Sequence, residues 1–542
     1  MHHIFEKSSF TIIFLLLLSA CAFFYKLGDP NFYHTRNESR RSEIAREMLE
    51  TGNWIVPQLE GEVTLTKPPL FYWVVALCSL KTGVNEFTAR IPSAIAGMGT
   101  ILFTFLLGSL LFNRKIGFWS ALILMVANMF MGQARYAEME SMLTFFITGS
   151  IYFFFKGYYE PARAKIWFSL FFAMMGLGTM TKGPFAFTFP LIPIIAYLFI
   201  YRDQKLLISK PFLFGIIFFF IILLPWSFLI LNIHPEFALV AIWETIGRVA
   251  TGFAHRRPFY YYFDQMSGTL FPWIFSLPFS IVIAFSKRLG HWRKENVFLL
   301  LWFLGNIIFL SLSKSKRDFY LLPVIPAIAL LTGSTWEAIW QWAGEKTNHI
   351  SVSIQRICFG VGSTLTGISL ITGSTFAFNI PSSHFPHNSP FLFFAGLNLM
   401  VVAGIKRFFP SLSTCKIALT TLIILTFTCY YSYFTYTVPI RNVDDSGKHF
   451  YVLVSKLINP LESLAFANIY ENYTFNFYVH RPVITLTNRD EVLTFMLAQG
   501  KRYLVLTEKN FRKLPPVPWK VKLKSKYAEH KSSGGYLLLC NQ

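Results

Sequence analysis

The residues best suited to chemistry in this chain are cations held in short polar stretches between long apolar runs. Lys67 stands directly before two consecutive prolines, which fix the backbone at the point where the chain turns back toward an apolar segment. A lysine held there is suited either to anchoring the chain at a membrane interface or to binding a phosphate group. Lys182 lies in a tight Thr-Lys-Gly-Pro turn, and Arg317 and Tyr320 share another short polar stretch.

Acidic residues accompany these cations in two places. Asn37 and Glu38 open a stretch that runs to Met48, in which apolar residues recur at helical spacing. This pattern predicts an amphipathic helix at the membrane interface, whose polar residues could simply face water. Glu140 stands at the start of a long apolar run. A carboxylate is costly next to hydrocarbon, so its presence there suggests a functional role.

The elements that must position these side chains are membrane spans. The chain has 542 residues, of which 54% are hydrophobic and 14% charged, whereas soluble domains carry about 25% charged residues. A bilayer can solvate so much apolar surface. Runs long enough to cross about 30 Å of hydrocarbon predict thirteen spans, near residues 10–26, 88–112, 117–134, 141–157, 166–181, 185–201, 212–232, 268–286, 296–313, 322–341, 353–378, 391–408 and 417–438. The segment 70–82 is shorter and is predicted to be an interfacial or re-entrant helix. The first run continues past Cys21, which favours an uncleaved first span over a signal peptide.

The net charge of +21 is explained by topology better than by nucleic-acid binding, because Lys and Arg accumulate in cytoplasmic loops. Alternate short loops are all basic, namely 113–115, 156–165, 202–210, 287–294, 346–356 and 406–416. This face is therefore predicted to be cytoplasmic, together with the N-terminus. Thirteen spans then place the C-terminus in the periplasm of a bacterium, with the protein in the inner membrane.

The opposite face also carries cations, against the positive-inside bias. They are Arg40, Arg41, Arg46, Lys67, Arg90, Arg135, Lys182, Arg248, Arg256, Arg257, Lys314, Lys316 and Arg317. Charges that oppose a topological rule are more often retained for function. Because they come from five loops, we expect them to line one cationic cavity.

The composition changes at about residue 439. Short strands are predicted at 463–469, 482–486, 502–507 and 535–540, with a helix at 487–499. We therefore predict a transmembrane domain at 1–438 and a small periplasmic α/β domain at 439–542. The second domain shows no motif of its own, which favours a structural or acceptor-docking role.

The order of the motifs resembles a known family. The series runs Asn-Glu-Ser-Arg-Arg-Ser-Glu-Ile-Ala-Arg-Glu-Met from Asn37, Lys-Pro-Pro-Leu-Phe-Tyr-Trp from Lys67, Arg-Ile-Pro-Ser-Ala from Arg90, Thr-Lys-Gly-Pro, Pro-Phe-Tyr-Tyr and Lys-Arg-Asp-Phe-Tyr-Leu-Leu-Pro. Over residues 27–335 it is similar to the aminoarabinose transferase branch of the glycosyltransferases that use lipid-linked sugars, relatives of the protein O-mannosyltransferases. The resemblance implies an α-helical polytopic membrane protein of the GT-C type, with about thirteen spans and the small C-terminal domain.

The resemblance also implies a reaction. Such enzymes pass a sugar from a polyprenyl (undecaprenyl) phosphate donor to a lipid A-type, glycan or protein acceptor outside the inner membrane. Lys67 and Arg248 would hold the donor phosphate, and Arg317 and Tyr320 would line the same cavity. The remaining cavity positions are Arg40, Arg135, Lys182 and His255.

The chain departs from the family at its acidic positions. Asn37 stands where the family has Asp, and Glu140 replaces the Asp that opens the fourth span. Glu38 or Glu140 would then supply a carboxylate, or the acceptor is itself an anion that needs no base; a catalytically silent relative is the third interpretation. Catalytic candidates are therefore Glu38, Glu140 and Asn37. Some relatives bind a divalent metal, but the sequence shows no clear ligands for one, since Thr66 precedes Lys67 and His255 has no matched partner.

Two other classes of function stay open. One is a transporter or flippase of lipid-linked sugars, which usually shows related halves and broken helices at mid-membrane. No such repeat is seen, and the charges gather on one face. The other is a binder of lipid-linked sugars without catalytic activity.

Overall fold

The protein is described from a computed structural model. The structure describes residues 8–542 except 33–35, 252–254, 272, 286–291, 345–419, 421, 422, 425, 429, 445, 468–472, 482, 517 and 526–534. Two of the predicted spans, 353–378 and 391–408, therefore lie outside the described residues, and thirteen spans stays a prediction.

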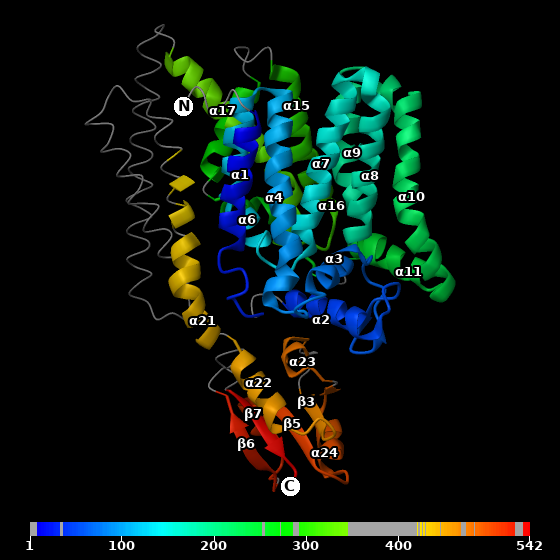
Figure 1. Ribbon diagram of the computed structural model, residues 1–542, viewed down its shortest axis with the longest axis vertical. Coiled ribbons are helices and arrows are strands. Elements are labelled where there is room, and N and C mark those ends of the chain that lie inside the picture. The colour runs from blue at the N-terminus through cyan, green and yellow to red at the C-terminus, as the bar shows by residue number, and fades with distance from the viewer. Residues whose placement is uncertain are drawn as a thin grey trace, which may run out of the picture.

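Long helices run side by side through most of the molecule and end at a common level (Figure 1). Their bounds are α1 Ser8–Phe24, α4 Glu86–Leu111, α5 Arg114–Met125, α7 Met139–Tyr159, α8 Ala164–Lys182, α9 Phe185–Ile200, α10 Lys210–Ile233 and α17 Ile325–Gly344. Within the described part of the chain, five stretches are long and apolar enough to cross a membrane: 86–111, 161–182, 210–233, 293–312 and 318–338. Leu224 and Phe228 of α10 are exposed, as expected for a helix that faces lipid.

Several predicted spans are interrupted. The predicted span 117–134 is divided into α5 and the short α6 (Asn128–Gln133), because Ala127 between them is extended. The predicted span 268–286 is divided among α13 (Tyr261–Thr269), η5 (Trp273–Ser276) and α14 (Leu277–Ala284). The predicted span 296–313 consists of α15 (Arg293–Leu300), the irregular turn η7 (Leu301–Gly305) and α16 (Asn306–Leu312). The predicted span 322–341 begins with the irregular turn η8 (Asp318–Val324) and continues as α17. Long apolar runs predict which segments lie in the bilayer, but they do not reveal breaks in the helices.

The long first loop forms a platform beneath the spans. Helix α2 (Arg36–Thr51) lies across their lower ends (Figure 1), and a short hairpin of β1 (Gln58–Leu59) and β2 (Glu62–Val63) follows it. Helix α3 (Leu70–Ser79) has ten residues, too few to cross a bilayer. The next helix, α4, begins at a capping box in which the Asn85 side chain accepts hydrogen bonds from the backbone of Phe87 and Thr88.

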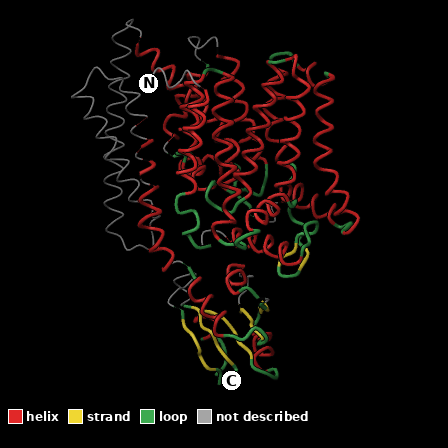
Figure 2. The backbone as a smooth tube through the Cα atoms, viewed as in Figure 1, coloured by secondary structure: helices red, strands yellow, loops and turns green. Residues whose placement is uncertain are grey.

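The last part of the chain forms a separate layer of strands below the helices (Figure 2). Five strands pair in the order β4-β3-β5-β7-β6. Strand β3 pairs in parallel with β4 and β5, and β7 pairs antiparallel with both β5 and β6. They are β3 Ser463–Ala467, β4 Ile484–Leu486, β5 Arg502–Thr507, β6 Lys520–Lys524 and β7 Tyr536–Cys540. The four predicted strands are found, as is the predicted helix, α24 (Arg489–Leu497), which Asn488 caps.

The C-terminal unit also contains helices that the sequence analysis did not predict. They are α22 (Lys448–Leu457), α23 (Tyr473–Val479) and the short α25 (Glu508–Phe511), and they follow η9 (Tyr433–Thr437) and α21 (Val438–Asp444). Helix α23 packs against α2. Between them, the Ser39 and Thr474 hydroxyl oxygens lie 3.0 Å apart, and Arg40 lies over the ring of Tyr473. The platform helix α2 is thus held from above by the spans and from below by the C-terminal unit.

Candidate active site

Helix α2 presents Arg41 to the spans. Asn37, Arg40 and Arg41 share one helical face because they are three and four residues apart. Arg41 pairs with the carboxylate of Glu138 and donates to the backbone oxygen of Ala137 at 3.2 Å. Burial lowers the pKa of Arg41, while the negative charge of Glu140 acts in the opposite direction. The guanidinium of Arg41 is therefore close to both acidic residues at the start of α7.

The second buried ion pair joins two spans. The Lys182 ammonium at the end of α8 donates to Glu140 Oε1 at 2.5 Å, and the two side chains are 10% and 2% exposed. The same ammonium lies 4.5 Å from the ring centre of Tyr320 and 5.6 Å from that of Phe319. The other oxygen, Glu140 Oε2, is buried and has no hydrogen-bond partner among the described residues. A buried carboxylate oxygen without a donor is costly, so this atom is a natural contact for a ligand.

The third ion pair is more open. Lys67 Nζ donates to Glu244 Oε2 at 2.9 Å, and the side chains are 26% and 11% exposed. Lys67 lies between the β1–β2 hairpin and α3, and Glu244 lies in the π-helical turn η4 (Trp243–Gly247). Irregular helical turns of this kind are frequent at functional sites.

The fourth contact connects two outer loops. Arg317 bonds to Nε2 of His255, and the backbone N–H of Lys316 donates to the His255 carbonyl oxygen at 3.1 Å. Arg256 and Ser315 form an isolated β-bridge beside them. This pairing brings Arg317 to η8, the turn that also carries Tyr320.

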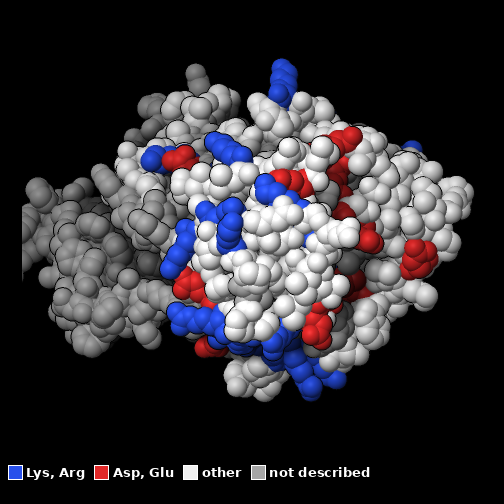
Figure 3. Space-filling model, turned by 90° about the horizontal axis from the view of Figure 1, so that it is seen from below, with Lys and Arg blue, Asp and Glu red and all other residues white. Residues whose placement is uncertain are grey.

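The structure therefore gathers many of the predicted site residues at one end of the spans. Lys182 contacts both Glu140 and Tyr320, and the charges of Arg40 and Arg317 act on Arg41. The face seen from the C-terminal side carries both signs of charge (Figure 3). Three carboxylates lie among the cations, so the arrangement is a set of ion pairs with an excess of positive charge.

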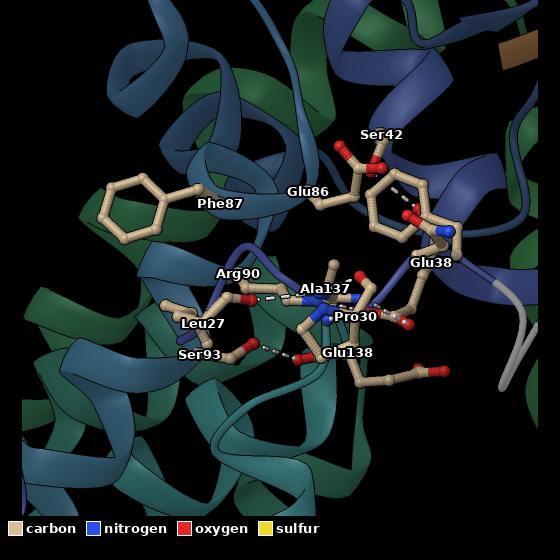
Figure 4. A network of polar contacts seen from close by, with 12 residues as sticks. Leu27, Pro30, Glu38, Ser42, Glu86, Phe87, Arg90, Ser93, Ala137 and Glu138 are labelled. Atoms are coloured by element: carbon tan, nitrogen blue, oxygen red, sulfur yellow. Dashed lines mark hydrogen bonds and ion pairs between the residues drawn. The ribbon is translucent and has the colours of Figure 1, made fainter. Parts of the chain in front are cut away.

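Two predicted site residues have structural partners instead. Glu38 is fully buried, and its carboxylate accepts from Arg90 at 2.8 and 3.2 Å and from the backbone N–H of Ala137 at 2.8 Å (Figure 4). Arg135 donates to the carbonyl oxygens of Ala22, Phe23 and Tyr25, at and just past the end of α1. A cation there satisfies carbonyls that the helix leaves unpaired and complements its dipole.

Two further predicted residues are placed without defined side-chain contacts. Asn37 is half-buried near the start of α2. Arg248 begins α12 (Arg248–Thr251), and its side chain lies outside what the structure describes.

The residues of this region do not fit a metal site. Within the described part of the chain, no three His, Cys, Asp or Glu side chains lie together. Nε2 of His255 is engaged by Arg317, and Thr66 offers only a hydroxyl group, 3.5 Å from that of Thr64. We therefore derive no step through a metal ion.

Sequence reasoning missed two acidic residues of this region, Glu138 and Glu244, and it named Arg41 only as one of the cations expected to line the cavity. Arg41 and Glu138 stand beside predicted site residues, but a sequence alone does not show which of two neighbours faces the cavity. Glu244 lies 177 positions from Lys67, and no spacing rule connects the two.

The sequence and the fold were compared with those of known proteins. Residues 13–241 match the family model described as dolichyl-phosphate-mannose-protein mannosyltransferase. The crystal structure of ArnT from Cupriavidus metallidurans bound to undecaprenyl phosphate superimposes with a TM-score of 0.80 at 18% identity, covering 99% of both chains. The fold is that of an aminoarabinose transferase. It is the GT-C type fold that the motifs implied.

Sequence relatives agree with this resemblance. An arabinosyl transferase from Pseudomonas fluorescens, named for undecaprenyl phosphate-α-4-amino-4-deoxy-L-arabinose, is 33% identical over 331 residues, which are 59% of each chain. An uncharacterized protein of Aquifex aeolicus is 32% identical over 57% of this chain and 60% of its own length. The alignments thus span less than two thirds of these relatives. The predicted resemblance to aminoarabinose transferases and to protein mannosyltransferases is confirmed.

Proposed function

We propose that this chain is a glycosyltransferase that takes a sugar from a polyprenyl phosphate donor and passes it to a lipid or glycan acceptor. The observation that carries the proposal is the meeting of Lys182, Glu140 and Tyr320 with the neighbouring cations at one end of the spans. The fold is shared with a protein crystallised with undecaprenyl phosphate, which supports a donor of that class.

The charges suit the departure of a phosphate. The acceptor oxygen forms a bond to the anomeric carbon of the sugar, the bond from that carbon to the phosphate oxygen breaks, and polyprenyl phosphate leaves with the electron pair. Lys67, with Arg248 and Arg317, stabilises the negative charge that develops on the phosphate. Because Lys67 and Arg317 lie in loops next to membrane segments, the polyprenyl tail can stay in the bilayer throughout.

Glu140 is the carboxylate that we assign to the acceptor side. Its Oε1 is bound by Lys182, whereas its buried Oε2 lacks a donor among the described residues. A hydroxyl acceptor would donate its proton toward Oε2, while an acceptor such as the phosphate of lipid A arrives as an anion and needs no base. Glu38 is assigned a structural role, because its carboxylate accepts hydrogen bonds from Arg90 and from the Ala137 backbone.

The membrane side follows from the charge distribution. The basic alternate loops place the N-terminus in the cytoplasm of a bacterium, and the site and the C-terminal unit then lie on the periplasmic side of the inner membrane. Fusion of a periplasm-dependent reporter after Leu80 and of a cytoplasm-dependent reporter after Asp203 tests this orientation. Activity of the opposite reporter at either position would reverse it.

Transfer of label tests the activity. Purified protein is given undecaprenyl phosphate carrying a radiolabelled sugar, together with a bacterial lipid extract, and the lipids are separated by chromatography. We expect label to move from the donor to a new lipid band. Donor that is bound but unchanged in every acceptor mixture would instead identify a binder without catalytic activity.

A further inference from the structure

The ion pair between Lys67 and Glu244 lies where the proposed donor phosphate would bind. Glu244 Oε2 accepts from Lys67 Nζ at 2.9 Å, and the lysine side chain remains about a quarter exposed. A phosphate that binds Lys67 must therefore share or break the contact with Glu244. This consequence rests on the proposed function.

The segment that carries Glu244 has one apolar side. It consists of α11 (Phe237–Ile242), η4 and α12, and it lies across the lower end of α10 (Figure 1). Leu239, Ile242, Trp243 and Ile246 recur at intervals of three and four residues, and all four are more than half exposed. A helical stripe of this kind, next to a lipid-facing span, is typical of a segment that lies in the membrane interface.

Glu244 lies on the other side of that segment. Its side chain is only 11% exposed and reaches inward to Lys67. The segment thus contacts the bilayer with one side and the site with the other. A ligand whose tail is in the membrane and whose head group is a phosphate would meet both sides.

We propose that Glu244 is a positioning residue that occupies the ammonium group of Lys67 until the phosphate of a polyprenyl ligand, arriving from the lipid side of segment 237–251, displaces it. The carboxylate keeps the lysine ordered and compensates its charge while the site is empty. A phosphate can replace it because it offers more acceptor oxygens and at least as much negative charge. The cost of releasing the carboxylate lowers the affinity for any anion that binds there.

Affinity for undecaprenyl phosphate tests this exchange. Dissociation constants are measured for the wild-type protein and Glu244→Gln in lipid nanodiscs, with undecaprenol as the uncharged comparison. Removing the competing charge should tighten undecaprenyl phosphate binding by about 2- to 5-fold, the range expected for a partly exposed ion pair. Undecaprenol affinity should not change, because the alcohol does not compete with a carboxylate.

Glu236→Gln is the matched control. Glu236 lies directly before the same segment and pairs with His234, but it is mostly exposed. Its substitution removes the same charge nearby and should leave both dissociation constants unchanged. In a Lys67→Gln background the effect of Glu244→Gln should disappear, because the two residues act through one contact.

The outcomes separate this inference from the function on which it rests. Unchanged or weaker phosphate binding by Glu244→Gln, in a protein whose phosphate binding depends on Lys67, overturns the exchange alone. Equal tightening by Glu236→Gln also overturns it, since the effect would then be one of general charge. A wild-type protein that does not distinguish the phosphate from the alcohol overturns the donor-binding proposal as well.

Discussion

Two neighbouring charge clusters, both formed against the start of α7, differ in how completely their atoms are paired. In the first, Arg90 donates to both oxygens of Glu38 and to the carbonyl oxygens of Leu27 and Pro30, and its guanidinium lies over Phe32. In the second, Glu140 holds Lys182 with one oxygen, and its other oxygen is buried without a donor among the described residues.

The difference favours a structural role for the first cluster and a ligand-binding role for the second, which burial alone does not distinguish. Both clusters are almost fully buried, and both oppose the positive-inside bias. A cluster whose donors and acceptors are all satisfied holds elements together, here the first loop, α4 and the segment before α7. A cluster with an unsatisfied atom retains capacity for a ligand.

The largest effect is expected from breaking the paired cluster. Arg90→Leu leaves the Glu38 carboxylate buried without its cation, which typically costs about 3–5 kcal/mol. We expect the variant to lose the single symmetric peak of the folded protein in size-exclusion chromatography. Lys115→Ala, at an exposed cation of α5, should elute like the wild type. If the Arg90→Leu protein folds and loses only sugar transfer, this cluster takes part in catalysis instead.

Lys67→Ala tests a partly exposed ion pair, in contrast to the buried pair of Arg90 and Glu38. Because the Lys67 side chain is 26% exposed and the ion pair is therefore only partly buried, the variant should fold and keep a melting temperature close to that of the wild type. Sugar transfer should fall by about 100- to 1,000-fold, as for the loss of one group that stabilises transition-state charge. The exposed Lys81→Ala provides the control for the label-transfer assay. Undiminished transfer would remove Lys67 from the site.

Asn37→Asp introduces the carboxylate that the motif resemblance implies at this position. If Glu140 already supplies the carboxylate, the initial rate of transfer should change by less than about 10-fold, whereas a newly supplied general base typically adds about 100-fold or more. Glu140→Gln, measured alone and with Asn37→Asp, completes the comparison. An inactive wild type that gains activity through the Asn37→Asp substitution would identify a silent relative.

The smallest effect concerns the far side of α2. Burial raises the pKa of Glu43 to about 7, despite the opposing charge of Arg46. A carboxyl whose pKa is raised by folding stabilises the folded state below its ordinary pKa of 4.5, and this contribution is lost as the pH rises through about 7. The melting temperature in detergent should therefore fall between pH 5 and pH 8, and less so in Glu43→Gln. An identical slope in both proteins would contradict the shift.

The sequence predicted much of the fold because hydrophobic length and strand patterns are local signals. Long apolar runs located α4, α8 and α10, and short, largely apolar runs located β3 and β5. The breaks at Ala127 and in segment 268–286 were missed because the backbone turns there inside an apolar run. The edge strand β6 was missed because its alternating Lys residues, such as Lys522, resemble a solvent-exposed loop.

The loops that form the site were predictable from the sequence, but the ion pairs between their residues were not. The motifs named Lys67, Lys182 and Tyr320 because an unusual cation or a proline marked each stretch. Charge alone, however, did not separate Arg135, which binds the end of α1, from Arg41, which meets Glu138. That distinction depends on which carbonyl or carboxylate lies opposite, and only the three-dimensional structure supplies it.

The contact of α2 with α23 has a consequence for the order of assembly. Ser39 and Thr474 are 435 positions apart, and Asn31 donates its backbone N–H to Asn442 across 411 positions. During synthesis the helix with Arg40 and Arg41 reaches its side of the membrane long before the residues that support it from below exist. Helix α2 therefore gains its contacts with the C-terminal unit only when synthesis is almost complete. A chain truncated midway could insert into the membrane but would lack the support beneath α2.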